Sequence, residues 1–284
     1  MKKFNLIRVG IAAFFILILS ACGVANLAYN NASAVANYYV DEWFELSSEQ
    51  SAWLKPRVTK LMVWHRANEL PTYRMLLAEA SQRLEINSNP QGDIARFYNE
   101  SRQAVERLTL QALPDMIAFL QTIDAKQITN LEKKFATENE KLAKEMRLSA
   151  DARRAKRLER ITERYATWMG KLSDAQIALI NASITPLPLT ETLRLADRQR
   201  WQKEFVALLN ASPNTSLLES ELRLLFITPE KRRAKDYQTT WQRQQDEMMK
   251  LTAELIAIAS VKQKQTMQKK LAGYAADLNG LLKV

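Results

Sequence analysis

The sequence predicts an all-α fold, an elongated array of about ten helices stacked in pairs. Three observations predict it. The chain has 284 residues but only 6 Gly and 8 Pro, and so few helix breakers favour long helices. No stretch shows the sustained alternation of apolar and polar residues that is typical of a strand. Hydrophobic residues make up 47% of the chain and charged residues 25%, a composition that favours a packed core over disorder.

One recurring start signal places the helices. The signal is an apolar residue, a Ser, Asp or Thr, and a Gln three positions later, and it resembles a capping box. The cap side chain accepts a hydrogen bond from a first-turn amide, and the Gln reaches back to the amide of the cap residue. The signal occurs at residues 46–50, 123–127 and 172–176, with degenerate copies at 227–231 and 259–263. The uneven spacing of these starts argues against a strict solenoid repeat.

Stop signals divide the helices further. Leu70 precedes Pro71, and a residue before Pro is disfavoured in the α region. Loops rich in Pro, Asn and Ser are expected at residues 87–92, 185–189 and 210–214. We therefore expect one helical domain over residues 37–284, with a sub-boundary near 185–190.

Charge and rare residues limit the chemistry. The net charge is +10, a mild attraction to anionic partners that falls short of a nucleic-acid signature. The single Cys excludes an intramolecular disulfide. One His leaves only one candidate base for nucleophilic catalysis and removes most metal sites with nitrogen or sulfur ligands. We therefore expect no metal, no cofactor and no enzymatic activity.

The first 22 residues have the anatomy of a secretory signal. Lys2, Lys3 and Arg8 form a positive start, and an apolar run follows over residues 9–19. The run is shorter than the roughly 20 apolar residues that span a bilayer. Small residues then precede Cys22, the only Cys of the chain. We expect residues 1–21 to be a cleaved signal peptide.

The segment Leu-Ser-Ala-Cys at residues 19–22 resembles a lipobox, the processing signal of bacterial lipoproteins. The resemblance implies that Cys22 carries acyl chains such as palmitate, and several chains anchor a protein stably. Residues 22–36 would then form the tether. Gly23 stands after the Cys where enterobacterial sorting signals place Asp for inner-membrane retention, which implies the outer membrane and its periplasmic face. The alternative is an ordinary signal peptide with an incidental Cys.

Two further blocks resemble a family of proteobacterial lipoproteins known only as a domain of unknown function. The blocks are Leu-Ala-Tyr-Asn at 27–30 with Asp-Glu-Trp-Phe-Glu-Leu-Ser-Ser-Glu-Gln at 41–50, and Trp-His-Arg at 64–66 with Glu-Leu-Pro-Thr-Tyr at 69–73. The aromatic residue that usually follows the Tyr-Asn pair is missing here. The start signal is also similar to the Leu-Thr-x-x-Gln motif of periplasmic helical proteins of the Spy and CpxP type, which bind unfolded clients.

Two groups of residues are candidate sites. His65, Arg66 and Glu69 share about one and a half helical turns, and His65 can pair with Glu69 four residues later. A carboxylate beside the imidazole would favour its charged form. The alternative is that these residues hold helix ends together. Arg153, Arg157, Arg160 and Arg164 have 4-3-4 spacing and form one stripe, which can bind anions or a partner, or can be an ordinary solvated face.

Three function classes remain open. The first is a non-enzymatic binding or scaffold lipoprotein that faces the periplasm, with envelope proteins or anionic envelope polymers as partners and no nucleic acid. The second is a chaperone-like holdase for unfolded or acidic clients. The third is a hydrolase that uses His65, for which no oriented nucleophile or metal constellation is visible. The sequence leaves the oligomeric state open.

Overall fold

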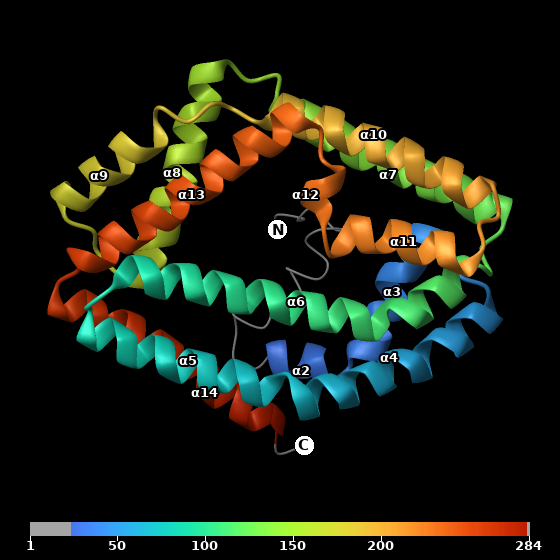
Figure 1. The fold of residues 1–284 in the computed structure, drawn as a ribbon, viewed down its shortest axis with the longest axis horizontal. Helices are drawn as coiled ribbons and strands as arrows, with labels where there is room; N and C mark the ends of the chain where they lie inside the picture. Colours follow the sequence, from blue (N-terminus) through green and yellow to red (C-terminus); the bar gives the residue numbers. More distant parts are fainter. Residues whose placement is uncertain (1–23, 283–284) are drawn as a thin grey trace.

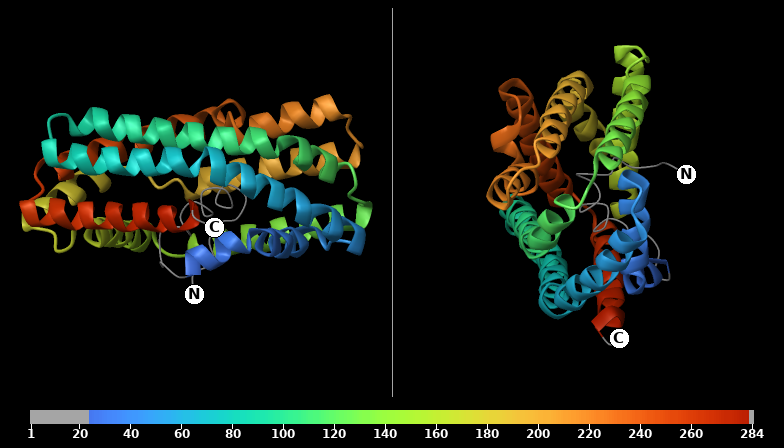
Figure 2. Two further views of the ribbon diagram at one scale, coloured as in Figure 1. Left: turned by 90° about the horizontal axis from the view of Figure 1, so that it is seen from below. Right: turned by 90° about the vertical axis from the view of Figure 1, so that its right-hand side faces the viewer.

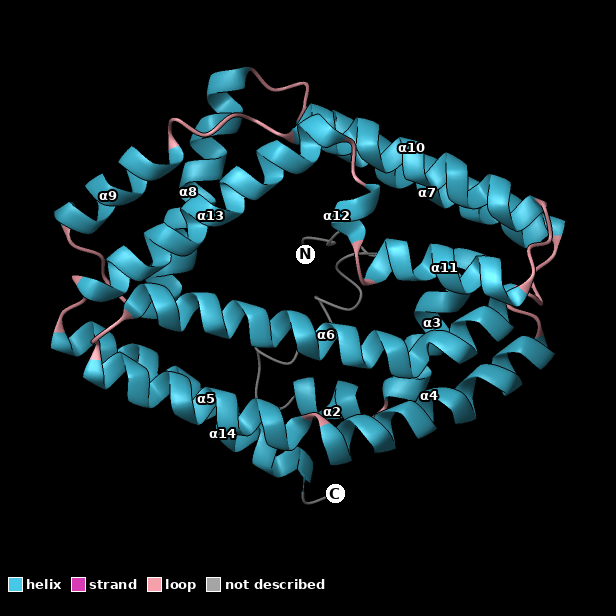
Figure 3. Cartoon of the chain, in the orientation of Figure 1, coloured by secondary structure: helices cyan, strands magenta, loops and turns pink. Residues whose placement is uncertain are grey.

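The computed structural model describes residues 24–282 and confirms the all-α prediction. Thirteen helices and no strand are present in this range (Figures 1 and 3). Their bounds are α2 Val24–Asn30, α3 Ala32–Phe44, α4 Ser48–Asn68, α5 Leu70–Ile86, α6 Pro90–Leu120, α7 Ala125–Glu145, α8 Ala150–Met169, α9 Asp174–Ile184, α10 Glu191–Asn210, α11 Thr215–Phe226, α12 Pro229–Arg232, α13 Lys235–Ala257 and α14 Val261–Leu282. None of these helices is both long enough and apolar enough to cross a bilayer.

Four of the five predicted capping boxes are present. At the fifth, residues 227–231, α12 begins at Pro229 but the Thr228 side chain makes no capping hydrogen bond. At α4, α7 and α9 the cap side chains of Ser47, Asp124 and Ser173 accept from the amide of the Gln three residues later, and that Gln side chain accepts from the cap amide. Ser260 and Gln263 make the same two bonds before α14, at 3.2 and 3.0 Å. Local chemistry therefore fixes where these helices begin.

The helices lie largely in pairs around a flattened, diamond-shaped outline (Figure 1). Helix α5 packs along α14, α7 along α10, α3 along α4, and α6 along both α13 and α11. The starts of α4 and α7 lie at one end of the long axis, and the starts of α9 and α14 lie at the other. Seen along the other two axes, α2 and α3 lie on one face of the molecule (Figure 2).

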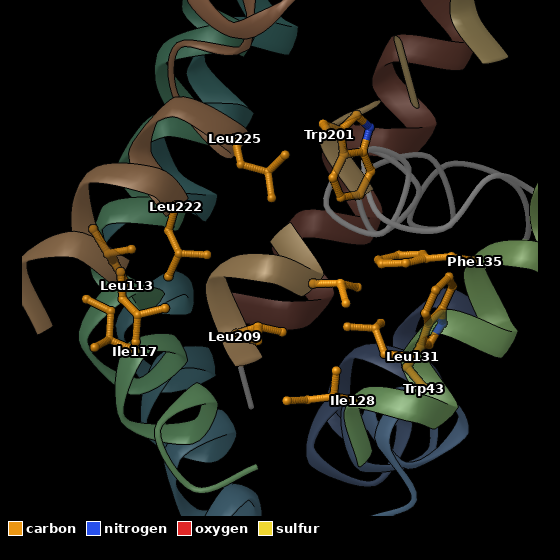
Figure 4. Close-up of a cluster of buried hydrophobic side chains, with 12 residues drawn as sticks. Trp43, Leu113, Ile117, Ile128, Leu131, Phe135, Trp201, Leu209, Leu222 and Leu225 are labelled. Atoms are coloured by element: carbon orange, nitrogen blue, oxygen red, sulfur yellow. The ribbon is translucent and has the colours of Figure 1, made fainter. Parts of the chain in front are cut away.

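The buried side chains form three clusters. One joins α3, α6, α7, α10 and α11, with Trp43, Phe135 and Trp201 at its aromatic centre (Figure 4). The second joins α8, α9, α13 and α14 near the opposite end. The third is small and joins α2, α5 and α14 through Tyr29, Leu70 and residues of the last two turns of α14. The core is thus distributed along the molecule.

The segment expected to be a tether is helical over the residues that the structure describes. Apart from Asn31, residues 24–36 belong to α2 and to the start of α3. Tyr29 is only 3% exposed, because its ring packs in the cluster with Leu70 and Leu278. A long-range contact therefore orders this segment, although its composition is small and polar.

Candidate functional site

Of the predicted site residues, the structure describes the polar group of His65, Arg66 and Glu69 but not the lipidation residue. Cys22 lies outside the described residues. His65 lies in the last turn of α4 and is fully buried. Its Nδ1 is hydrogen-bonded to the Tyr29 hydroxyl at 2.9 Å. The Tyr73 ring meets the imidazole edge to face, with ring centroids 5.5 Å apart. The imidazole is thus enclosed by two aromatic rings from α2 and α5.

Glu69 is the residue that joins α4 to α5, and its strongest partner is an arginine. It is 2% exposed. Arg107 of α6 binds it bidentately, with Nε and Nη2 donating to the two carboxylate oxygens at 2.7 and 2.9 Å. Such fork geometry is stronger than a single-point charge contact. The salt bridge of Glu69 therefore runs to a third helix, and the carboxylate clamps α6 onto the junction of α4 and α5.

Burial decides the protonation of His65. Desolvation lowers its pKa from 6.5 to about 4, and the opposing charge of Glu69 is the smaller effect. The Glu69 carboxylate favours the charged imidazole, as expected, but desolvation of the buried ring outweighs this effect. Burial also raises the pKa of Tyr29 to about 12, although Arg66 opposes the shift. His65 and Tyr29 are both neutral at pH 7.

Arg66 connects the two blocks of the sequence that resemble the lipoprotein family. Its Nη2 donates to Oδ1 of Asn30 at 2.9 Å, and its guanidinium carbon lies 5.5 Å from the centroid of the Tyr29 ring. The Tyr-Asn block and the Trp-His-Arg block, 36 residues apart, therefore contact each other. Of the three residues predicted as a polar site, His65 and Glu69 are buried and Arg66 is half-buried. Each has a structural partner on another helix, and the imidazole has no exposed surface.

The arginine stripe on α8 divides into two halves. Arg153 pairs with Glu191 at 3.3 Å. Arg157 donates to the carbonyl oxygens of Ile184, Leu187 and Pro188 at 2.9, 2.7 and 2.9 Å, and burial lowers its pKa. These two arginines bind the 184–191 segment, which was the expected sub-boundary, to α8. Arg160 and Arg164 remain exposed.

Arg164 borders an apolar cavity that sequence reasoning did not predict. The cavity has a volume of about 360 Å³ and lies among α5, α6, α8, α13 and α14. Part of its wall belongs to the second core cluster, including Tyr165, Leu255 and three methionines. Those methionines are Met169, Met248 and Met267. Unbranched thioether side chains fill irregular gaps and adapt to different occupants.

Charged side chains at the cavity come from α5, α6 and α8. Arg83 lies 3.6 Å from Glu79 and 3.5 Å from Asp93. Arg96 binds Glu79 through two contacts, one of them from Nη2 to Oε2 at 2.8 Å. Arg164 makes no ion pair with any residue in the described range. The cavity thus combines an apolar interior with three arginines and two carboxylates.

The lining residues come from segments more than 150 positions apart, so no local motif signals the cavity. Even the three lining methionines, Met169, Met248 and Met267, lie on three different helices. Within residues 24–282, no three His, Cys, Asp or Glu side chains gather closely enough to hold a metal ion.

Comparison with curated proteins and with solved structures found no match. A comparison with protein families found one whose model matches residues 41–238 and whose description is a family of unknown function, DUF6279. The match covers more than half of the chain, from the Asp-Glu-Trp-Phe block to the start of α13. It includes the His65 cluster except for Tyr29 and Asn30, and most helices that line the cavity. The chain therefore belongs to the family of unknown function DUF6279.

Proposed function

We propose that this protein is a non-enzymatic binding lipoprotein, anchored by lipid on Cys22 to the periplasmic face of the outer membrane, and that the cavity is its binding site. The cavity of about 360 Å³ carries this proposal. Ligand pockets usually start at about 300 Å³ and are predominantly apolar with a few placed polar groups. The walls described above have this character, so an apolar ligand is the best match.

The apolar wall of this space supports a binding role. The cavity is partly open to solvent, so this wall is in contact with water. An apolar ligand that covers the wall removes apolar surface from water, which is favourable. The wall is formed by α5, α6, α8, α13 and α14, so a bound ligand would also tie the first half of the chain to the last two helices.

The contacts of the polar candidates support a role without catalysis. His65 is buried against Tyr29 and Tyr73, and Glu69 is held by Arg107. A general base must reach its substrate within hydrogen-bond distance, and a fully buried imidazole offers no such surface. His65 and Glu69 thus have structural partners, and a hydrolase that uses His65 has the least support.

The anchor is tested by metabolic labelling. Cells that express the wild-type chain or Cys22→Ser are grown with an alkyne-bearing fatty acid, and the N-terminal peptide is analysed by mass spectrometry. Wild type should carry label and begin at Cys22, and the variant should carry none. A wild-type chain without label, or with another N-terminus, would overturn the anchor.

The cavity is tested in the same cells with a fatty acid that carries both an alkyne and a diazirine. After ultraviolet irradiation, light-dependent cross-links should map to α5, α8 and α13. Ala80, which lines the cavity from α5, offers a blocking variant: Ala80→Leu should reduce these cross-links. Ala78→Leu, two residues before Ala80 on the same helix, is the matched control: Ala78 is exposed and does not line the cavity, so the cross-links should be unchanged. Cross-links spread evenly over the surface would contradict a binding site.

A second candidate function is a holdase, which the exposed apolar side chains at the same end of the molecule favour. Ile86, Ile258 and Val261 are 57%, 53% and 73% exposed. Asn87 Nδ2 donates to the Ala257 carbonyl at 3.5 Å, which places the ends of α5 and α13 side by side. A holdase should suppress aggregation of an unfolding client at near-stoichiometric ratio, and Val261→Asp should weaken that effect. Absence of suppression would leave the cavity as the binding site.

A further inference from the structure

We propose that the cavity takes a single-chain anionic amphiphile, an alkyl chain that ends in a carboxylate, with the alkyl chain inside the cavity and the carboxylate at Arg164. This inference rests on the proposed binding function and names its ligand class. Two observations carry it: the apolar interior, which matches an alkyl chain, and the charge at the cavity, which matches an anion.

The charges at the cavity leave one positive charge without a counter-charge. Arg83 and Arg96 share the two carboxylates of Glu79 and Asp93. These four side chains neutralise one another. Arg164 is the remaining charged residue of the lining, it is exposed, and it forms no ion pair within residues 24–282. An anionic group that reaches it therefore gains a charge-assisted hydrogen bond without breaking an existing salt bridge.

The position of Arg164 on α8 joins the charge to the apolar wall. Arg164 and Trp168 both line the cavity, and residues four apart lie on one face of a helix. Further along α8, Tyr165 and Trp168 are followed by Met169, which is only 2% exposed. A ligand with its carboxylate at Arg164 thus extends along α8 from an exposed end to a buried one. This polarity matches an amphiphile better than a wholly apolar molecule.

The neighbouring Arg160 supplies a matched control. It lies one turn before Arg164 on the same helix and is also exposed, but it does not line the cavity. Arg160→Gln and Arg164→Gln therefore remove the same charge from the same helix. Long-range attraction would respond equally to both substitutions, whereas a contact at the cavity mouth responds only to Arg164→Gln.

The test is calorimetric titration of the full-length protein in zwitterionic nanodiscs, with empty nanodiscs as the blank. The probes are alkyl carboxylates of increasing chain length, the alkyl alcohols and the alkyltrimethylammonium ions. Affinity should rise about three- to fourfold with each methylene group until the cavity is full. Carboxylates should bind about fivefold more tightly than alcohols of equal length, and the cations more weakly than both.

Arg164→Gln should remove the preference for carboxylates over alcohols and leave the dependence on chain length intact, while Arg160→Gln should behave as wild type. Circular dichroism checks that each variant is folded. Equal affinity for carboxylates, alcohols and cations in the wild type would overturn the anionic ligand but keep the cavity as an apolar binding site. If Arg160→Gln and Arg164→Gln lose the preference for carboxylates equally, the preference comes from long-range electrostatic attraction. That result would overturn the Arg164 contact. No binding by any probe would contradict the proposed function itself.

Discussion

Gln176 and Gln263 form a reciprocal amide pair. Nε2 of Gln176 donates to Oε1 of Gln263 at 3.0 Å, and Nε2 of Gln263 donates to Oε1 of Gln176 at 2.8 Å. Each side-chain oxygen also accepts from the amide of its own cap residue, Ser173 or Ser260. The two capping boxes thus fasten the starts of α9 and α14 to each other. Both glutamines are at least 92% buried, so each bond is protected from water.

Removal of this amide pair should destabilise the protein by more than an ordinary side-chain truncation. Gln176→Ala leaves buried partners on Gln263 and Ser173 unsatisfied, at a cost of about 2–3 kcal/mol in the free energy of unfolding. In a double-mutant cycle with Gln263→Ala, the double variant should lose less stability than the sum of the two single losses, by about 1 kcal/mol or more. Urea unfolding measures both quantities, and strict additivity would show that the pair is not coupled.

A second pair at the opposite end of the molecule repeats the arrangement. Gln50 and Gln127 donate to each other at 3.1 and 2.7 Å. These two boxes start α4 and α7. The recurring Gln of the start signal therefore has a structural role at each end. The similarity to Leu-Thr-x-x-Gln proteins is explained by helix packing, and it does not by itself indicate chaperone activity.

The two partners of the salt bridge between Glu69 and Arg107 should differ in how much stability their removal costs. The Glu69 side chain is 3% exposed and the Arg107 side chain is 39% exposed. Arg107→Met should therefore cost about 3 kcal/mol, because it leaves a buried carboxylate without a counter-charge. Glu69→Gln should cost less, because the freed guanidinium can be solvated. Chemical denaturation of both variants checks the order, and a larger loss for Glu69→Gln would contradict this account.

His65 makes stability depend on pH. Its pKa is lowered to about 4 in the folded protein from 6.5, so the unfolded chain binds more protons between these values. The contribution of His65 to the free energy of unfolding is therefore fully present above about pH 6.5. It is lost as the pH falls toward about 4, by up to about 3 kcal/mol. The difference in the free energy of unfolding between wild type and His65→Gln, measured from about pH 4 to pH 7.5, should follow this curve.

A direct control does not require the variant to fold. The chain has one histidine, so an untagged protein gives a single set of imidazole signals in an NMR titration. These signals should show a midpoint well below 6.5. A midpoint at or above that value would mean that the imidazole is solvated or held in its charged form.

Arg157 should be more important for stability than its neighbours in the stripe. It donates to the backbone carbonyl of Ile184 at the end of α9 and to those of Leu187 and Pro188 in the segment that follows. Arg157→Met should release that segment from α8. We expect a loss of about 2 kcal/mol in the free energy of unfolding and faster cleavage near residue 186 in limited proteolysis. Arg160→Met should change neither result by a measurable amount, because Arg160 is exposed. Equal effects of the two substitutions would refute the assignment.

The parts of the fold that local chemistry determines were predictable from the sequence. The helix starts at 47, 124, 173 and 260 depend on residues three positions apart, and the structure confirms all four. The described residues contain thirteen helices where about ten were expected. One reason is that the segment expected to be a tether forms α2 and the start of α3. A break near Pro71 was also found, but it lies at Glu69, and Leu70, which was expected to leave the α region, is the first residue of α5.

The parts that depend on distant contacts were not predictable. The spacing of His65 and Glu69 suggested that they pair, but Arg107, 38 residues beyond Glu69, supplies the bidentate partner. The stripe on α8 was visible as a pattern, yet only tertiary packing decides that Arg157 is engaged and Arg164 is exposed. The cavity requires five helices to be placed, and no single segment contains its signal.

Hydrogen–deuterium exchange of the full-length protein, with and without a saturating alkyl carboxylate, tests the binding site most directly. The account predicts slower exchange confined to residues 76–86 of α5, 164–169 of α8 and 248–256 of α13, the ranges that contribute lining residues. Ala80→Leu should abolish this protection, because the larger side chain occupies the cavity. Protection centred on α2 to α4, protection that persists in Ala80→Leu, or no change at saturation would contradict a ligand in this cavity.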